Sequence, residues 1–275
     1  MMKQTKNQVP KLCISIAKRP GKFGFTVHNA GFKSLGLNFT YIPFTTNNLK
    51  GVIEGIRALN IRGCSVSMPF KEKVIPFLDE LDSLAKSTKA VNTIVNDEGH
   101  LIGYNTDVIG VKKCIESKKI KKNKKILILG SGGIAKAIFV ALSELNLKNI
   151  TVCNRTTQRA KKLAKNYNVD FIKWPDKEKI KTDVIINATS IGMHPNNAIL
   201  PLSESFLRTS EVIMDVVASP VNTKLIKFAN KNNIISINGF ELAFFQSCEQ
   251  FKLYTNKKPP VRIMKKAAME LMGEK

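Results

Sequence analysis

The length and composition of the chain exclude several classes of protein. Its 275 residues can form two medium-sized domains, and its 43% hydrophobic and 24% charged residues are close to the globular average. The sequence holds no apolar run of the ~18 residues that a membrane span needs. Its five cysteines are widely spaced and form no Cys-x-x-Cys pair, which argues against a disulfide framework and a zinc site. We therefore expect a folded cytoplasmic protein that binds neither a membrane nor a metal.

The chain is strongly basic, with 44 Lys and Arg against 21 Asp and Glu and a net charge of +23. Such an excess is typical of nucleic-acid-binding proteins when it is concentrated in one patch. Here most lysines are scattered, and the one dense run, over residues 118–125, contains neither arginine nor aromatic side chains. We interpret that run as a solvated linker or strand entrance and expect no nucleic acid partner. The net charge still favours anionic ligands through long-range attraction.

The first hundred residues alternate between short β-branched runs and segments with helical periodicity. In chain order we expect a strand at KLCISIA, a loop over 19–24, a helix closed by Gly36, a strand at LNFTYIPF, an amphipathic helix over 48–59, a strand at GCSVSM, a helix opened by Pro69-Phe70-Lys71, and two strands joined by a turn over 97–99. Proline favours a helix start because its missing N–H has no partner there in any case. This part of the chain reads as β-α-β-α-β, then a helix and a hairpin.

A second series of alternating elements begins at residue 126. We expect a strand at ILILG, a glycine-rich turn, a helix over 134–145, a strand at NITVCN, a helix over 158–167, strands at DVIINA and EVIMDVV, a helix over 222–230 and a strand at IISING. Apolar strands that alternate with helices indicate a parallel sheet covered on both faces. The segment 241–272 is helical, and we expect it to return to the first domain. The predicted domains are then residues 1–106 plus 240–275, and residues 107–239.

The glycine-rich turn of the second series has the pattern and the context of a dinucleotide site. It lies between an expected strand and an expected helix, as a Gly-x-Gly pattern must if it is to bind a pyrophosphate. Glycines let the backbone turn tightly and let the phosphates approach the N–H groups at the helix start. The candidate cofactor-binding residues are Gly130, Ser131, Gly132, Gly133 and Ile134.

The end of the next strand indicates which dinucleotide binds. Asn154, Arg155 and Thr156 stand where NAD-specific sites place a carboxylate for the ribose hydroxyls. A carboxylate would repel a 2′-phosphate, whereas Arg155 and Arg159, one helical turn apart, can bind it through charge-assisted hydrogen bonds. This pattern favours NADP over NAD. The alternative for Arg155 is a solvated cation at a helix start.

A loop of small residues follows a third strand of the series. Its composition suits a segment that passes the nicotinamide ribose. The candidates in this loop are Thr189, Ser190, Gly192 and Met193.

Two polar residues at the ends of elements are candidates for chemistry. Hydride transfer from an alcohol requires one group that accepts the hydroxyl proton and another that orients the hydroxyl. Lys71 lies at an expected helix start and Asp107 at a strand-to-helix junction, which are places where sites are commonly built. By spacing alone, an exposed helix lysine and an N-cap aspartate also explain the two residues.

Several short motifs, taken together, resemble those of a known family. They are His28-Asn29, LGL over 35–37, Pro69-Phe70-Lys71, Val91-Asn92-Thr93, Asn105-Thr106-Asp107, GSGG, NRTTQRA, NATSIGM, SPVNT, and Gly239 with Gln246. In this order and spacing they resemble the shikimate dehydrogenase family over almost the whole chain. The resemblance implies an α/β fold with an N-terminal substrate domain, built on a mainly parallel mixed sheet, and a Rossmann domain that binds NADP. It also implies reversible reduction of 3-dehydroshikimate to shikimate.

The resemblance assigns roles to individual residues. It makes Lys71 and Asp107 the catalytic pair, and it implies that Asn92 and Gln246 hold substrate hydroxyls. It adds Gly239 to the residues near the cofactor. A small-molecule substrate and a monomer or homodimer are expected.

The chain departs from the family pattern at three places. The family usually has a Ser-x-Ser-Pro segment for the substrate carboxylate, and here the segment reads KFGFT, in which Lys22 supplies a charge or Thr26 a hydroxyl. Ser65 and Ser67 replace Asn and Thr, which keeps a hydroxyl at Ser67 and loses an amide. Ala218 stands where a tyrosine is often found. These changes resemble a divergent shikimate dehydrogenase-like branch.

Two alternatives follow from these departures. The chain could be a dehydrogenase of quinate or a related cyclic hydroxy acid with weak shikimate activity. It could also be a regulatory protein that binds NADP without catalysis, although Lys71 and Asp107 together argue against that function.

Overall fold

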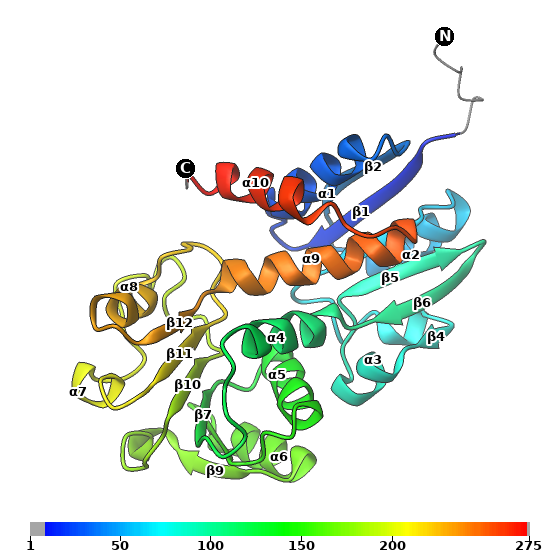
Figure 1. Cartoon of the computed structure of the whole chain (residues 1–275). Helices are drawn as coiled ribbons and strands as arrows, with labels where there is room; N and C mark the ends of the chain where they lie inside the picture. The colour runs from blue at the N-terminus through cyan, green and yellow to red at the C-terminus, as the bar shows by residue number, and fades with distance from the viewer. Residues whose placement is uncertain (1–8, 274–275) are drawn as a thin grey trace. The chain divides into compact units, whose positions relative to one another are not determined.

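The computed structural model describes residues 9–273, which fold as two compact units (Figure 1). Unit 1 holds the described residues up to Thr106 and from Ser247 onward, and unit 2 holds Asp107–Gln246. Helix α9 (Gly239–Thr255), the long orange helix in Figure 1, contributes residues to both units. Among the described residues, no helix is both long and apolar enough to cross a membrane.

Unit 1 is built on a mixed six-stranded sheet of order β2-β1-β3-β5-β6-β4. Its strands are β1 (Lys11–Ala17), β2 (Phe39–Thr45), β3 (Gly63–Val66), β4 (Glu80–Leu81), β5 (Thr93–Asp97) and β6 (His100–Tyr104). Strand β1 pairs in parallel with β2 and β3, and β4 pairs in parallel with β6. Strand β5 is antiparallel to both β3 and β6. The β5–β6 turn is the expected one, and Glu98 and Gly99 take positive φ angles of 50° and 93°, which suit a two-residue hairpin.

The helices of unit 1 largely follow the expected periodicity. They are α1 (Phe23–Ser34), α2 (Leu49–Ala58), α3 (Ser83–Thr88), the second half of α9, α10 (Val261–Leu271) and the short 3-10 helix η1 (Ile75–Phe77). The Asn48 side chain caps α2 by accepting the Gly51 N–H. Ile53 and Ile56 of α2 pack with Ile14, Ile16 and other apolar residues of the sheet in one core cluster.

The prediction of a helix that begins at Pro69-Phe70-Lys71 is wrong. Residues 71–74 form turns that lead into η1. An α-helix that began at residue 69 would need the residue-76 amide to bond to the carbonyl of residue 72, and Pro76 has no N–H. The loop expected over 19–24 is also shorter, because α1 already begins at Phe23. Lys71 therefore lies on a turn between β3 and η1.

Unit 2 is a parallel sheet of order β12-β11-β10-β7-β8-β9, in which every neighbouring pair is parallel. Its strands are β7 (Ile126–Leu129), β8 (Ile150–Asn154), β9 (Asp170–Lys173), β10 (Val184–Asn187), β11 (Val212–Asp215) and β12 (Ile235–Ile237). Numbered from β7, the order is 3-2-1-4-5-6, the order of the Rossmann fold. The expected parallel sheet is confirmed.

Helices connect these strands, as the alternating pattern predicted. They are α4 (Thr106–Ser117), α5 (Gly133–Glu144), α6 (Thr157–Tyr167), α7 (Glu204–Leu207), α8 (Lys224–Lys231) and the first half of α9, with the 3-10 helix η2 (Trp174–Asp176) after β9. Strand β9 and helix α7 were not predicted. Strand β9 lies at the sheet edge with three of its four residues exposed, so it lacks the apolar run that marked the other strands.

Candidate functional site

The turn between β7 and α5 requires glycine at its first position. Gly130 has φ +119°, and a Cβ there would lie 2.6 Å from the carbonyl oxygen of Ala188. The Gly130 N–H donates to the Cys153 carbonyl (2.8 Å), while the Ala188 N–H donates to the Leu129 carbonyl (2.8 Å). The turn is thus held between the ends of β8 and β10. The strand order changes direction between β7 and β10, and ligands of such sheets bind at that point, beyond the carboxyl ends of the strands.

The fold does not require glycine at position 132 as it does at position 130. Gly132 is the N-cap of α5, with an ordinary φ of −81°, and a Cβ built on it meets no atom within 4 Å. Neither backbone strain nor packing within the fold explains a glycine here. No side chain among the described residues caps α5, and its first turn holds no acidic residue. The open space and the uncapped helix start suit an anionic group that approaches the backbone N–H groups.

Two arginines lie near the start of α6, which follows β8, the strand next to β7 in the sheet. Arg155 and Arg159 are exposed, and neither forms an ion pair within residues 9–273. Helix α6 has no side-chain cap and no acidic residue in its first turn, while Asn154 Nδ2 donates to the Thr156 carbonyl (3.0 Å). Positive charge therefore gathers at the carboxyl end of β8 without an acidic partner, as a site for a phosphate group requires.

A buried hydrogen-bond network, which the sequence did not predict, lies next to the loop that follows β10. Asn187 and Asp215 end adjacent strands in register, and Asn187 Nδ2 donates to Asp215 Oδ1 (3.0 Å). Thr223, which caps α8, donates to Asp215 Oδ2 (2.7 Å). Burial raises the pKa of the Asp215 carboxyl, and these hydrogen bonds oppose that shift. The missed signal was a polar residue at the end of each of two otherwise apolar strands.

The same network shapes the loop that holds the predicted nicotinamide residues. Thr189 Oγ1 donates to Asn187 Oδ1 (2.6 Å) and accepts from the Ile191 N–H (3.1 Å). Gly192 adopts φ +99°, and Met193 is partly exposed. The Thr189 hydroxyl is therefore engaged inside the loop. Ser190 and Met193 of this loop are exposed.

In unit 1, the candidate substrate residues gather at one edge of the mixed sheet. Strands β1 and β3 are parallel, so both end there, and β5 runs antiparallel to β3, so it begins there. The Val66 N–H donates to the Asn92 carbonyl (2.8 Å), and the Val91 N–H donates to the Lys71 carbonyl (2.8 Å). Ser67, Lys71 and Asn92 are thus brought together, with Ser67 exposed and Lys71 half-buried.

Strand β6 ends at the same edge and leads into α4. Its antiparallel pairing with β5 sets Tyr104 opposite Thr93. Thr106 is the first residue of α4, and its N–H donates to Asn92 Oδ1 (2.8 Å). Asp107 is the second residue of α4 and is 2% exposed. It lies inside the first helical turn and is not the N-cap that spacing alone allowed.

Two buried tyrosines, Tyr41 and Tyr254, lie beside two of the places where the chain departs from the family pattern. Lys22 is the exposed N-cap residue of α1, and Thr26 is half-buried one turn later. A Cβ at Gly24 would lie 2.9 Å from the Tyr41 hydroxyl, so the ring leaves no room for a side chain there. Ser65 Oγ lies 3.3 Å from the hydroxyl of Tyr254. The two phenols fill space beside positions 24 and 65, where the family pattern has serine and asparagine.

Gly239 and Gln246 both lie on α9. A Cβ at Gly239 would come within 2.3 Å of the Val217 carbonyl oxygen, so packing alone requires glycine there. Gln246 is half-buried, and Ala218 is half-buried beside the same Val217. The difference at position 218, where the family often has a tyrosine and this chain has Ala218, rests on the sequence alone.

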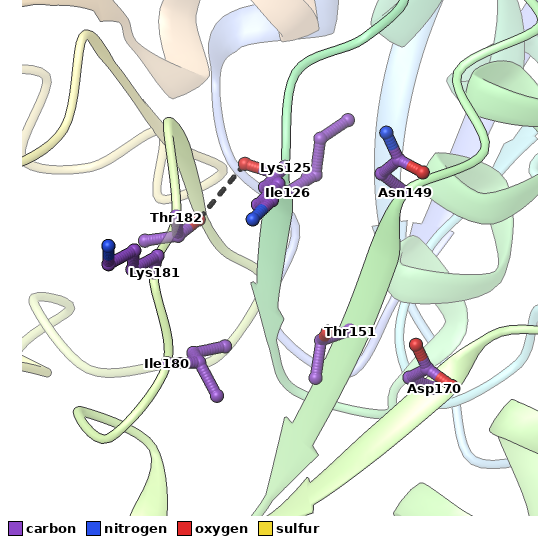
Figure 2. A pocket seen from close by; sticks show the side chains of 8 residues that line it. All are labelled: Lys125, Ile126, Asn149, Thr151, Asp170, Ile180, Lys181 and Thr182. Atoms are coloured by element: carbon purple, nitrogen blue, oxygen red, sulfur yellow. Dashed lines mark hydrogen bonds between the residues drawn. The ribbon is translucent and has the colours of Figure 1, made fainter.

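A pocket of about 250 Å³ lies elsewhere in unit 2 (Figure 2). It is lined by Lys125, Ile126, Asn149, Thr151, Asp170, Ile180, Lys181 and Thr182. Thr182 Oγ1 donates to the Lys125 carbonyl (3.0 Å), as the dashed line in Figure 2 shows. These residues stand at or just before the amino ends of β7, β8, β9 and β10, whereas the glycine-rich turn follows the carboxyl end of β7. We therefore do not assign the cofactor to this pocket. No cluster of three or more His, Cys, Asp or Glu side chains within residues 9–273 could hold a metal ion.

The chain matches two family models that together cover most of it. Residues 24–94 match the shikimate dehydrogenase substrate binding domain, and residues 114–232 match the shikimate / quinate 5-dehydrogenase model. A shikimate dehydrogenase-like protein of Haemophilus influenzae is 40% identical over 95% of this chain and 97% of its own length. A shikimate dehydrogenase (NADP(+)) of Pyrococcus furiosus is 39% identical over 90% of this chain and 91% of its own.

Solved structures agree with these sequence matches. The shikimate 5-dehydrogenase of Thermus thermophilus, crystallised with NADP(H) and shikimate, superposes with a TM-score of 0.86 at 27% identity. That superposition covers 95% of this chain and 99% of the other. The resemblance seen in the motifs and the expected two-domain α/β fold are confirmed. The chain belongs to the shikimate dehydrogenase family.

Proposed function

We propose that the protein is an NADP-dependent oxidoreductase that interconverts 3-dehydroshikimate and shikimate. The observation that carries the proposal is the gathering of Ser67, Lys71 and Asn92 at one edge of the unit 1 sheet, where β6 leads through Thr106 to Asp107. In the oxidative direction, a ring hydroxyl loses its proton while its carbon loses a hydride. Asp107 orients that hydroxyl, and Lys71 accepts and relays its proton.

The residues of unit 2 fit NADP as the cofactor. The Gly132 backbone and the uncapped start of α5 would hold the pyrophosphate, and Arg155 with Arg159 would hold the 2′-phosphate. The loop from Thr189 to Met193 would pass the nicotinamide ribose. When bound, NADP⁺ supplies the hydride acceptor. The chain itself contributes binding, orientation and the movement of the hydroxyl proton.

Replacement of Lys71 by Met tests the catalytic assignment. Loss of a general acid–base group costs about 10²- to 10⁴-fold in turnover, so we expect kcat for shikimate oxidation to fall by at least about a hundredfold. Lys73→Met is the matched control, because Lys73 is exposed two residues further along the same turn. Both variants should keep the melting temperature of the wild type. Near-wild-type turnover of Lys71→Met would refute the role of Lys71.

A related cyclic hydroxy acid such as quinate is the second candidate substrate. The observation that favours it is the altered carboxylate segment, in which Lys22 stands at the N-cap position of α1 and Tyr41 occupies the space beside Gly24. Quinate is bulkier than shikimate at the ring carbon that bears the carboxylate, so this segment should decide between them. Steady-state assays with shikimate and quinate, each with NADP and NAD, separate the two candidates. A protein that binds NADP and oxidises neither acid would instead support a non-catalytic function.

A further inference from the structure

A chain of buried side chains links α9 to the first turn of α4. Gln250 of α9 is 2% exposed, and its Nε2 donates to Thr93 Oγ1 (2.9 Å). Thr93 Oγ1 donates in turn to Asn92 Oδ1 (2.9 Å). Asn92 and Thr93 are fully buried, and Thr106 is 2% exposed. The whole chain of hydrogen bonds therefore lies out of contact with water.

Chemistry determines the direction of the first of these hydrogen bonds. The amide nitrogen of Gln250 can only donate, so the Thr93 hydroxyl must accept from it. That hydroxyl has a single proton, and its nearest acceptor is Asn92 Oδ1 (2.9 Å), with Thr106 Oγ1 at 3.2 Å. Asn92 Oδ1 thus accepts from both Thr93 and the Thr106 N–H (2.8 Å), while Asn92 Nδ2 donates to Thr106 Oγ1 (3.0 Å). Without the Gln250 donor, the Thr93 hydroxyl could rotate, and Asn92 would lose one of the contacts that hold it against Thr106.

Asn92 uses this orientation to cap α4. The first N–H groups of a helix have no partner within the helix. The Thr106 N–H, at the first residue of α4, donates to Asn92 Oδ1 (2.8 Å), although Asn92 lies fourteen residues earlier in the chain. Asp107 is the next residue. The position of its backbone thus depends on the side chain of Asn92.

Stability alone does not account for an amide at position 250. Phe251 and Tyr254 of the same helix are almost fully buried, and the His28 ring stacks with Phe251 at a centroid distance of 6.4 Å. In such apolar surroundings, a buried amide adds little net stability even when it is hydrogen-bonded. Gln250 also lies one helical turn after Gln246, on the same face of α9.

We propose that Gln250 is a positioning residue that acts through Thr93 and Asn92 to fix the first turn of α4 and hence Asp107. The proposal rests on the proposed function, in which Asp107 orients the substrate hydroxyl. Misplacement of a reacting group by about 1 Å can cost about a hundredfold in rate. Loss of the Gln250 donor should therefore reduce turnover while cofactor binding changes little.

Three single variants and one double variant of the full chain test this proposal. Gln250→Met keeps the length of the side chain and removes the donor. Thr93→Val keeps the shape of threonine and removes the hydroxyl, whereas Thr93→Ser keeps the hydroxyl and serves as the matched control. We expect kcat for shikimate oxidation to fall at least tenfold in the first two variants, with KM for NADP within about twofold, whereas kcat of Thr93→Ser should stay near that of the wild type. The double variant Gln250→Met/Thr93→Val should be no slower than the slower single variant, because both changes break the same chain.

Hydrogen exchange provides a readout that does not depend on activity. In Gln250→Met and Thr93→Val, the amides at the start of α4 should exchange at least tenfold faster than in the wild type, while those of α5 stay unchanged. Unchanged exchange at the start of α4, or a uniform rise over the whole chain, would overturn the proposal. If the wild type oxidises no shikimate and the exchange still rises only at α4, the coupling stands and the proposed function fails.

Discussion

Two glycines of the β7–α5 turn should respond in opposite ways to the same substitution. Gly130→Ala places a methyl group at φ +119°, 2.6 Å from the Ala188 carbonyl oxygen and 3.2 Å from the Thr189 nitrogen. Both neighbours are backbone atoms, so no side chain can move aside. Gly132→Ala places its methyl group in open space at φ −81°. One variant therefore tests the fold and the other tests the ligand site.

The cost of Gly130→Ala can be worked from two terms. A non-glycine residue in a sparsely populated backbone region costs about 1–3 kcal/mol. Overpacking against atoms that cannot relax costs about 1–3 kcal/mol more. The sum, about 2–6 kcal/mol, is a large part of a typical stability of about 5–15 kcal/mol. For a unit of this size, about 2–4 °C accompanies each kcal/mol, so the melting temperature should fall by at least about 4 °C.

Gly132→Ala should leave the melting temperature within about 2 °C of the wild type, because the loss of a glycine N-cap and the reduced freedom of the unfolded chain nearly cancel. Its KM for NADP should rise at least about tenfold, because the methyl group stands where the pyrophosphate approaches the α5 amides. Thermal unfolding and steady-state kinetics measure the two effects. A stable Gly130→Ala variant would refute the packing argument. A Gly132→Ala variant with unchanged NADP affinity would refute the pyrophosphate site.

Two further predictions concern charge. Arg155→Ser and Arg159→Ser should each lower the ratio of kcat/KM with NADP to that with NAD by at least about tenfold, since a charge-assisted hydrogen bond contributes about 1.5–3 kcal/mol; Arg262→Ser, at an exposed site of α10, should not. A wild type that prefers NAD would contradict this assignment. Burial lowers the pKa of His28 to about 4, below its ordinary value of 6.5, so the unfolded chain binds a proton that the folded chain does not. Stability should fall as the pH drops from 6.5 to 4, by about 3 kcal/mol more in the wild type than in His28→Phe, whereas the exposed His194→Phe should follow the wild type. Equal pH dependence of unfolding in His28→Phe and the wild type would be the contrary result.

The environment of His28 explains that low pKa. The ring is fully buried and stacks on Tyr41 at a centroid distance of 4.7 Å. Neither ring nitrogen has a hydrogen-bond partner among the described residues. Gln250 approaches closely enough to oppose the shift, without the geometry of a full hydrogen bond. Burial without a hydrogen-bond partner for either ring nitrogen disfavours the charged imidazolium and leaves the imidazole neutral.

Local sequence signals determined much of the fold and of the cofactor half of the site. Short apolar runs between helical segments predicted the parallel sheet of unit 2, because strands buried on both faces leave a continuous apolar signature. The Gly130 turn could be predicted because the strand, the glycine pattern and the helix are contiguous in the chain. Arg155 was assigned to the 2′-phosphate because of its distance along the sequence from the glycine-rich turn. Each of these features depends on neighbours within a few dozen residues.

Tertiary structure decided the features that depend on distant neighbours. The Lys71 carbonyl accepts from the Val91 N–H, twenty positions away, whereas Pro76, which prevents an α-helix from residue 69, is a local signal that the prediction did not include. The pairing of Asn187 with Asp215 required two strands to lie in register. The contact of Gln250 with Thr93 joins residues 157 positions apart, so no periodicity or spacing could indicate it. The sequence by itself therefore determined the type of fold, the glycine turn and the motifs of the family, whereas the folded chain decided which buried side chains hold the candidate catalytic residues in place.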